Sequence, residues 1–266
     1  MMTGMSQAQK AYLRKRSHDK RMVTIWRVLL FLLFLGAWEG STQAGWLDSF
    51  IFSSPSQVWN TFVSMCGSHA LFSHIGVTLY ETLISFVLVL LLGIASAVLL
   101  WSFPRVSRIL EPYLVVLNSL PKSALAPLLI VWLGANRKTI IVAGISVAVF
   151  GSIISLYSGF LQVDKEKLKL IETLGGGKKD ALFKVVLPSS IPLILSVMKV
   201  NIGLCLVGVV IGEFIGAREG LGYLIIYGSQ VFKLDWVIMS IVILCILATG
   251  LYGVLNFTEK MYQKRR

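Results

Sequence analysis

Charged residues are scarce in this sequence. Only 14% of its 266 residues are Asp, Glu, Lys or Arg, whereas 56% are hydrophobic. A soluble domain carries about 25% charged residues, so this chain cannot cover a water-facing surface of its length. The shortage excludes an ordinary soluble enzyme and predicts a polytopic membrane protein.

Acidic residues are the rarer kind, with 13 Asp and Glu against 25 Lys and Arg and a formal net charge of +12. Such an excess can indicate a nucleic-acid-binding domain. The basic residues of this chain, however, stand at the ends of apolar runs and do not gather on one soluble face. We therefore expect no nucleic-acid partner.

Cysteine is nearly absent, since only Cys66, Cys205 and Cys245 occur. Their odd number and wide spacing match no metal-ligand pattern. Cys205 and Cys245 fall within apolar runs, where packing is the favoured role. We expect no metal site, no catalytic residue and no cofactor bound by this chain.

Long apolar runs, by contrast, are abundant, and a spanning helix needs about 20 mostly apolar residues. Six runs qualify, at about 23–41, 75–101, 109–133, 138–161, 190–215 and 236–257. They predict an all-α polytopic fold with six transmembrane helices in residues 23–266, after a basic N-terminal segment at 1–22. A cleaved signal peptide is the alternative for the first run, but the residues that follow it, 42–44, form a poor cleavage site.

Lys and Arg set the expected orientation, because they are enriched in cytoplasmic loops. They gather at both termini, between the second and third runs, and above all in the segment 162–189, whereas 40–74 contains none. We therefore expect both termini and the 162–189 loop in the cytoplasm.

The outer segment 40–74 contains a helix signal. Ser54 can act as the N-cap, and Pro55 suits the first helical position. Apolar residues then recur at helical spacing, at Val58, Trp59, Phe62 and Met65. We expect a short amphipathic helix at the outer surface of the bilayer, acting as a packing element rather than a ligand site.

The 162–189 loop is the largest polar segment between the spans. Asp164 can cap a helix that runs to Leu174, and the glycines 175–177 can end it. A second helix over 179–186 would lead to Pro188, which suits the start of the next span. The apolar residues of the first helix have no core of their own to enter: Leu168, Ile171 and Leu174. They need either the bilayer surface or a partner protein, and periodicity alone does not decide between the two.

The string GGGKKD in this loop looks like part of a phosphate-binding loop. A Walker A motif needs a preceding strand and Ser or Thr after its lysine, but here Lys178 is followed by Lys179. We therefore do not expect the chain to hydrolyse ATP itself.

The loop resembles the cytoplasmic EAA loop of ABC-importer permeases, whose pattern is E-A-A, three residues, G, nine residues and I-x-L-P. Four positions of that pattern are present with the spacing intact, at Gly175, Val185, Leu187 and Pro188. The Glu-Ala-Ala triplet is replaced by Lys-Leu-Ile at 169–171. Contacts of the family's glutamate are thus either lost or supplied by Glu172, one turn on.

Two more stretches resemble the nitrate/taurine/sulfonate branch of these permeases. One is NSLPKSALAPLLIVWLG at 118–134, with Pro121 and Pro127 in place, and the other is GEFIGAREGLGYLI at 212–225. With the loop they form three ordered signatures over roughly 78–260. The chain is thereby identified as a type I (MetI-like) ABC-importer permease of the bacterial cytoplasmic membrane.

The resemblance implies a transport subunit that is not itself an enzyme. It implies a dimer of permease subunits, two ABC ATPase subunits that carry ATP and Mg, and an extracytoplasmic substrate-binding protein. The first helix of the loop would be the coupling helix, seated in a groove of the ATPase. The implied coupling residues are Leu168, Lys169, Ile171, Glu172, Leu174, Gly175, Leu187 and Pro188.

Polar residues inside the apolar runs are candidates for the translocation path, because transporter sites lie where spanning helices are broken. They are Asn118, Ser119, Pro121, Lys122, Pro127, Lys199 and Asn201. Two lysines at one depth, doubled in a dimer, would suit an anionic solute such as a sulfonate, taurine, nitrate or a related small molecule. The alternative is that each lysine pairs with backbone carbonyls or helps to close an inner gate.

Residues near the outer end of the fifth run are expected to act in packing. Gly208, Gly212 and Gly216 repeat every four residues, a spacing that lets helices approach closely in lipid. Glu213 can bond to the glycine-rich segment that follows it. Glu81 and Glu111 lie near the ends of their runs, where we expect water to reach them.

An ion-coupled secondary transporter without an ATPase partner is the alternative function, and a membrane scaffold that transports nothing is a third. A secondary carrier would be expected to show paired repeats or carboxylates within the membrane, and neither is evident in the sequence. The EAA-like spacing therefore favours the importer.

Overall fold

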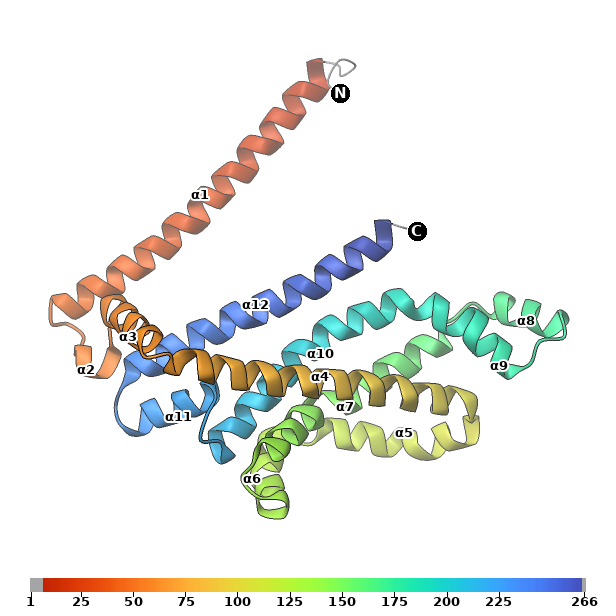
Figure 1. Cartoon of the computed structure of the whole chain (residues 1–266). Coiled ribbons are helices and arrows are strands. Elements are labelled where there is room, and N and C mark those ends of the chain that lie inside the picture. Colours follow the sequence, from red (N-terminus) through yellow and green to blue (C-terminus); the bar gives the residue numbers. More distant parts are fainter. Residues whose placement is uncertain (1–6, 265–266) are drawn as a thin grey trace.

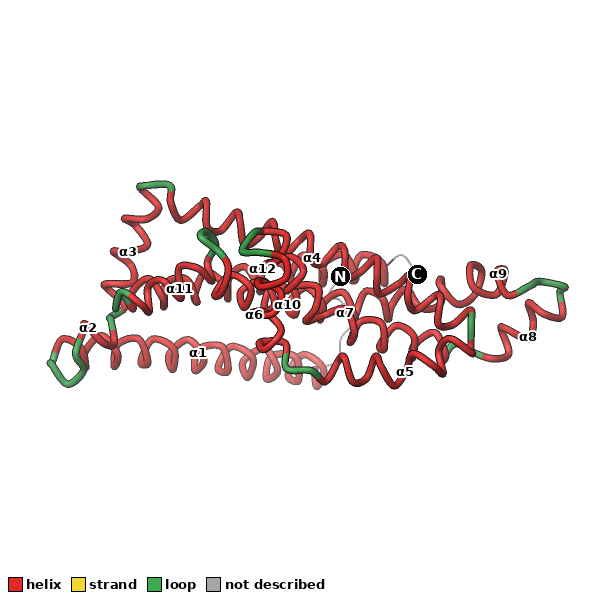
Figure 2. The backbone as a smooth tube through the Cα atoms, turned by 90° about the horizontal axis from the view of Figure 1, so that it is seen from below, coloured by secondary structure: helices red, strands yellow, loops and turns green. Residues whose placement is uncertain are grey.

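The computed structural model describes residues 7–264, and these contain helices and connecting loops without a strand (Figure 2). The ends of the two basic termini, 1–6 and 265–266, lie outside the described residues. The elements are α1 Gln7–Gln43, α2 Ser49–Phe52, α3 Pro55–Gly67, α4 Ala70–Ser102, α5 Pro104–Ser119, α6 Lys122–Leu133, α7 Arg137–Leu161, α8 Lys165–Thr173, α9 Lys178–Ala181, the π-helix η1 Leu182–Val186, α10 Leu187–Gly216, α11 Leu221–Gln230 and α12 Leu234–Lys264.

Five helical stretches in the described part of the chain are long and apolar enough to cross a membrane. They are Arg21–Gln43, Ala70–Ser102, Arg137–Leu161, Lys178–Gly216 and Leu234–Lys264. The pair α5 and α6 gives a sixth span if it is counted as one, but the two helices meet at an angle of 96°. Helix α5 ends at Ser119, and the extended backbone of Leu120 and Pro121 makes the bend. Pro127, by contrast, lies inside α6 without ending it.

Helix α7 packs against both α4 and α10, and these three helices form the centre of the bundle. Glycines allow the close approach. A Cβ atom added to Gly208 of α10 would lie only 2.8 Å from the Cα atom of Gly144 in α7. One added to Gly212 would meet the Ala143 Cβ atom at 3.2 Å, and Gly216 faces α6 instead. The packing role expected for these glycines is confirmed.

Apolar side chains form three clusters along the bundle. The central cluster contains Phe86, Val89, Leu100, Ala148, Val149, Ile153, Ile202 and Cys205. A second cluster lies where α3 and α11 meet α12, and contains Met65, Leu71, Leu221, Leu224, Met239 and Ile243. The third lies at the opposite end, beside α9 and η1, and contains Ala97, Leu156, Phe160, Leu182 and Val186. Figure 1 shows these two ends, with α2, α3 and α11 at one and α8 and α9 at the other.

Helix α3 forms as the sequence predicts. The Ser54 hydroxyl caps it by accepting a hydrogen bond from the Gln57 N–H at 3.3 Å, and Pro55 is its first residue. Met65 is buried, whereas Trp59 remains 64% exposed. The amphipathic helix therefore packs one face on the bundle and turns an aromatic side chain outward.

Helix α1 projects from the rest of the bundle and packs chiefly against α2 and α3 (Figure 1). Every large apolar side chain described between Met22 and Phe34 is at least 40% exposed. Such a surface is stable in lipid or against another subunit, but not in water.

Candidate functional site

The polar loop between α7 and α10 begins with a capped helix. The Asp164 carboxylate accepts a hydrogen bond from the Glu166 N–H at 2.9 Å, which satisfies one of the free donors at the start of α8. The helix ends at Thr173, and the next residues close it with backbone bonds, among them Gly176 N–H to the Ile171 carbonyl at 2.8 Å. Gly175 has φ of +81°, the left-handed conformation that glycine adopts at little cost. The expected sequence of helix and glycine turn is therefore present.

The apolar residues of this loop divide between the bundle and the surface. Leu182 and Val186 are buried in the cluster beside η1, and the half-buried Leu168 packs against that cluster. The expectation that Leu168 has no core to enter is wrong, because its side chain packs against the apolar cluster beside α9 and η1. Leu170, Leu174 and Phe183 are 58%, 74% and 66% exposed. These three residues, which we call the outward apolar face, are not buried against the rest of the described chain.

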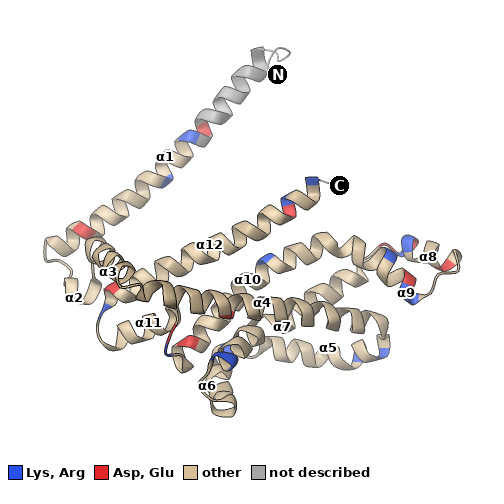
Figure 3. Cartoon of the chain, viewed as in Figure 1, with Lys and Arg blue, Asp and Glu red and all other residues tan. Residues whose placement is uncertain are grey.

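A groove of about 650 Å³ separates α8 from the turn between α4 and α5. Lys169, Ile171 and Glu172 line it from α8, opposite Trp101 and Pro104. Lys169 and Ile171, two of the three residues at the family's Glu-Ala-Ala position, therefore face a groove within the chain, whereas Leu170 between them belongs to the outward apolar face. Lys and Arg gather here and on the adjoining turn of α5, as Figure 3 shows.

No break in the helix separates the second half of the loop from α10. A separate helix over 179–186 was expected, with Pro188 starting the next span. Instead α9, η1 and α10 form one unbroken helical stretch from Lys178 to Gly216. Pro188 has no N–H to donate to the residue four positions earlier, and the π-turn immediately before it accommodates the change in hydrogen-bond pattern. Leu187 and Pro188 are thus inside a helix rather than at its free start.

Lys122 occupies the break in the third span. It is the first residue of α6, and its ammonium group donates to the Leu117 carbonyl and lies 5.3 Å from the centre of the Phe150 ring. The carbonyls at the end of α5 are free because no helix continues there, so they can accept from this lysine. Asn118 lies close by and faces Gly151 of α7, and Ser119 donates to the Val115 carbonyl at 2.9 Å. Four of the predicted path residues, from 118 to 122, therefore gather at one bend.

Lys199 and Asn201 of α10, which were also predicted to line the path, do not lie at the bend between α5 and α6. The Lys199 ammonium group forms an ion pair with the Glu259 carboxylate of α12 and lies 5.8 Å from the centre of the Tyr252 ring. The buried Asn201 amide donates to the Ser152 hydroxyl of α7 at 2.9 Å. Sequence reasoning missed the Glu259 partner, because 60 residues separate it from Lys199 and no periodic pattern connects them.

Two carboxyl groups are buried within the bundle, which the sequence did not indicate. Glu213 accepts hydrogen bonds from the Thr78 hydroxyl and the Gly222 N–H, each at 2.6 Å. Its expected bond to the glycine-rich segment is thus confirmed. Glu81, which was expected near water, has 0% exposed surface. That expectation is wrong, because the segment 216–222 folds back over the end of α4 and covers it. Glu111 of α5 is exposed, as expected.

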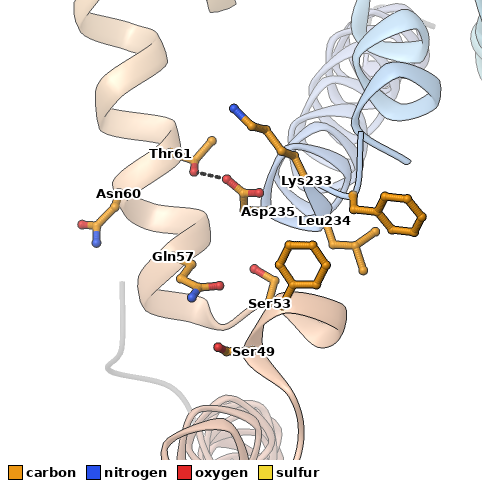
Figure 4. A pocket seen from close by; sticks show the side chains of 10 residues that line it. Ser49, Ser53, Gln57, Asn60, Thr61, Lys233, Leu234 and Asp235 are labelled. Atoms are coloured by element: carbon orange, nitrogen blue, oxygen red, sulfur yellow. Dashed lines mark hydrogen bonds between the residues drawn. The ribbon is translucent and has the colours of Figure 1, made fainter. Parts of the chain in front are cut away.

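A polar pocket of about 450 Å³ opens at the end of the bundle that carries α2 and α3. Thr61 of α3 and Asp235 of α12 point toward each other across it and are hydrogen-bonded (Figure 4). Ser53 and Phe232 on its walls have φ of +53° and +58°, which is uncommon for residues other than glycine. The pocket joins segments far apart in sequence, so no local motif could have predicted it.

The sequence of the chain matches known transport proteins. A family model described as the inner membrane component of binding-protein-dependent transport systems matches residues 89–259. The chain belongs to this family. It is therefore an ABC-importer permease, a multi-pass inner-membrane subunit whose family leaves ATP hydrolysis to separate ATPase subunits, and the ion-coupled alternative is not favoured.

Curated relatives cover most of the permease. A probable ABC transporter permease protein of Haemophilus influenzae is 30% identical over 85% of this chain and 93% of its own length. The formylaminopyrimidine transport permease ThiX of Halalkalibacterium halodurans is 28% identical over 73% of this chain and 77% of its own. The taurine transport permease TauC of Escherichia coli is 25% identical over 73% and 72%.

Solved structures support the fold. A chain of the MetNI methionine ABC transporter in an inward-facing conformation aligns with a TM-score of 0.65 over 72% of the permease and 95% of that chain, at 18% identity. A chain of an amino acid ABC transporter aligns with a TM-score of 0.61 over 75% and 98%, at 19% identity. The MetI-like fold expected from the sequence is confirmed.

Proposed function

We propose that the 162–189 loop is the docking element through which an ATPase subunit drives this permease. The observation that carries the proposal is the outward apolar face, which is exposed on α8 (Leu170), at its C-cap (Leu174) and on η1 (Phe183). A helix of nine residues is marginal in water by itself, so a partner that covers this face would stabilise it. Gly175 sets the direction in which the chain leaves α8.

The residues named from the family pattern then have two kinds of role. Leu174 and Gly175 would contact the ATPase or shape the contact, with Lys169, Ile171 and Glu172 along the groove beside it. Leu168, Leu187 and Pro188 would act from within the permease, by fixing the loop to the bundle. Glu172 is exposed and can provide the acidic contact that Lys169 does not.

The assembly would contain two copies of this permease, two ATPase subunits that bind ATP and Mg, and one extracytoplasmic binding protein. In this arrangement both termini and α8 are cytoplasmic, as the concentration of Lys and Arg at the α8 and α9 end supports. The binding protein would meet the opposite end, where the pocket between α3 and α12 lies.

The solute would be a small molecule with an anionic group, such as a sulfonate, taurine or nitrate. Lys122 supports this class, because it is a half-buried cation at the bend of a broken span, next to Asn118 and Ser119. Two relatives also point to small polar solutes by name, one for taurine and one for formylaminopyrimidine. Lys199 has its own counter-ion, and we assign it to the support of α10 rather than to solute contact.

The test of docking is cross-linking in the assembled transporter. A cysteine at Leu174 should capture the ATPase, whereas a cysteine at Leu168, which faces the bundle, should capture it poorly. Equal capture from both positions, or none from either, would contradict the proposal. A ligand screen of the cognate binding protein against sulfonates, nitrate and pyrimidine precursors then tests the solute class.

A further inference from the structure

A cleft of about 270 Å³ opens between α4, the start of α7 and the turn after α10. Arg137, Arg218 and Glu219 lie along it, and the Arg137 guanidinium donates to the Glu219 carboxylate at 2.7 Å. Glu81 also lines the cleft, although its side chain has no exposed surface. The cleft therefore leads from the end of the bundle that carries α11 to a buried carboxyl group.

Glu213 accepts hydrogen bonds from α4 and from the start of α11. Glu213 accepts from Thr78 and from the Gly222 N–H, and the Thr78 hydroxyl in turn accepts from the Leu221 N–H at 2.8 Å. These N–H groups form the start of α11, where the helix dipole favours a negative charge. A Cβ atom at Gly220 would lie 2.3 Å from a Glu213 carboxylate oxygen, so only glycine allows this approach. The fold is thus shaped to hold an ionised Glu213.

The Glu81 carboxyl group, unlike that of Glu213, is not held by hydrogen-bond donors of the described residues. Neither of its carboxyl oxygens receives a hydrogen bond from any residue that the structure describes. Thr78, which lies one turn before Glu81 on α4, donates to Glu213, so the two buried carboxyl groups are neighbours in the interior of the bundle. Ionised carboxylates are acceptors only, so a bond between these two groups requires a proton. Two bare negative charges as neighbours, away from water, would repel each other strongly.

The other charged and titratable groups around the pair do not supply the missing positive charge. His74 of α4 accepts the Gly220 N–H at its Nδ1 atom, which makes it the neutral form with its proton on Nε2. Arg137 of α7 and Arg218 of the turn line the cleft, but the Arg137 guanidinium is paired with Glu219. Neither arginine forms a hydrogen bond with the Glu81 carboxyl group. No group of three or more His, Cys, Asp or Glu side chains among residues 7–264 could hold a metal ion.

We propose that Glu81 and Glu213 form a binding site for one exchangeable proton, which enters through the cleft between α4 and α7. The proton resides on Glu81 and is shared with Glu213, which stays ionised at the start of α11. When the proton leaves through the cleft, the two carboxylates repel each other, and the segment 217–222 loses its anchor. The site lies at the opposite end of the molecule from α8, and it does not depend on the ATPase-docking proposal.

The proton can be detected directly in the full-length permease, purified and reconstituted in lipid nanodiscs. Infrared spectra should contain the C=O stretch of a protonated, buried carboxyl group at neutral pH, and this band should disappear as pH rises. Glu81→Gln should remove the band, whereas Glu111→Gln, at an exposed position of α5, should leave it unchanged. A band unaffected by both Glu81→Gln and Glu213→Gln would overturn the proposal.

Thermal unfolding gives a second readout. Because the folded state binds a proton that the unfolded chain releases, the melting temperature of the wild type should fall as pH rises above neutrality. Glu81→Gln keeps the shape and a hydrogen-bond donor without a titrating group, so its melting temperature should change much less over the same range. The measurements are repeated in sodium and in choline. If sodium at constant pH removes the infrared band and stabilises the wild type, the site holds a metal cation and the proton proposal is wrong.

Discussion

Lys199 of α10 and Glu259 of α12 form an ion pair in which each side chain is only 14% exposed. The pair joins the helix that continues from the 162–189 loop to α12, and Tyr252 of α12 lies beside the ammonium group. A cation and an anion that neutralise each other in this way can remain at the lipid boundary, where either alone would be costly.

The first prediction concerns this pair. Lys199→Met should lower the melting temperature of the permease, because it leaves Glu259 without its partner. Glu259→Gln should do the same, and the double variant should recover part of the loss. The measurement is a double-mutant cycle of thermal unfolding in detergent or nanodiscs. Additive losses would show that the two side chains do not interact.

The second prediction concerns the glycine turn after α8. Gly175→Val should uncouple the transporter, since a β-branched residue at φ of +81° costs of order 1–3 kcal/mol and would redirect the chain. Uptake should fall, and ATP hydrolysis should stop responding to loaded binding protein, while the spans still insert. Gly177→Ala is the matched control, because Gly177 has a negative φ and nothing within 4 Å of its added Cβ atom. Normal uptake by Gly175→Val would leave the loop as a plain connector.

The third prediction tests the outward apolar face. Leu174→Asp should weaken binding of the ATPase, because it places a charge in an apolar contact, yet it should leave the isolated permease as stable as the wild type. Leu182→Asp should instead unfold the permease, because Leu182 is buried. Co-purification of the ATPase, together with thermal unfolding of the permease alone, separates the two effects. A loss of stability in Leu174→Asp would place this side chain inside the permease fold.

The fourth prediction concerns the solute path. Lys122→Met should reduce uptake of an anionic solute while assembly and basal ATP hydrolysis stay near normal. Lys138→Met, at an exposed position at the start of α7, is the control and should transport normally. If Lys122 instead holds the broken span together through the Leu117 carbonyl, expression and stability should fall together. Unchanged uptake in a stable Lys122→Met complex would remove this residue from the path.

The fifth prediction concerns the approach of Glu213 to the segment after α10. Gly220→Ala should lower the melting temperature, because the new Cβ atom would collide with the carboxylate and Gly220 has φ of +112°. A strained position of this kind costs of order 1–3 kcal/mol. Gly203→Ala, which has open space around its Cβ position, should be neutral or stabilising. Equal melting temperatures for the two variants would mean that the segment can move away freely.

Features determined by short stretches of sequence could be predicted. The caps at Ser54 and Asp164 and the left-handed Gly175 depend on residues within one turn, and all three are present. Five of the six apolar runs coincide with helices long enough to span a bilayer, because bilayer thickness sets the length of such a run, whereas the run at 109–133 is divided between α5 and α6. The three signatures identified the family for the same reason, since each is contiguous in the chain.

Features that depend on distant segments could not be predicted. Glu81 is buried because the segment 216–222 covers it, and no pattern around residue 81 contains that information. The direction of the bend at Pro121 and the continuity of the helix through Pro188 also depend on packing, since a proline signals a disturbance without deciding whether the chain turns, widens or continues. The same applies to the side of α8 on which Leu168 lies.

The unbroken helix from Lys178 to Gly216 gives the two halves of the loop different mechanical connections. Between α8 and α9, three glycines, one of them left-handed, form a turn at which α8 can change its direction relative to α9. Between α9 and the fifth span there is no such turn. A force or torque applied to α9 is therefore transmitted along the continuous helix to α10. Work delivered to this loop would therefore reach the membrane mainly through α10, with α7 serving as the fixed support against which it turns.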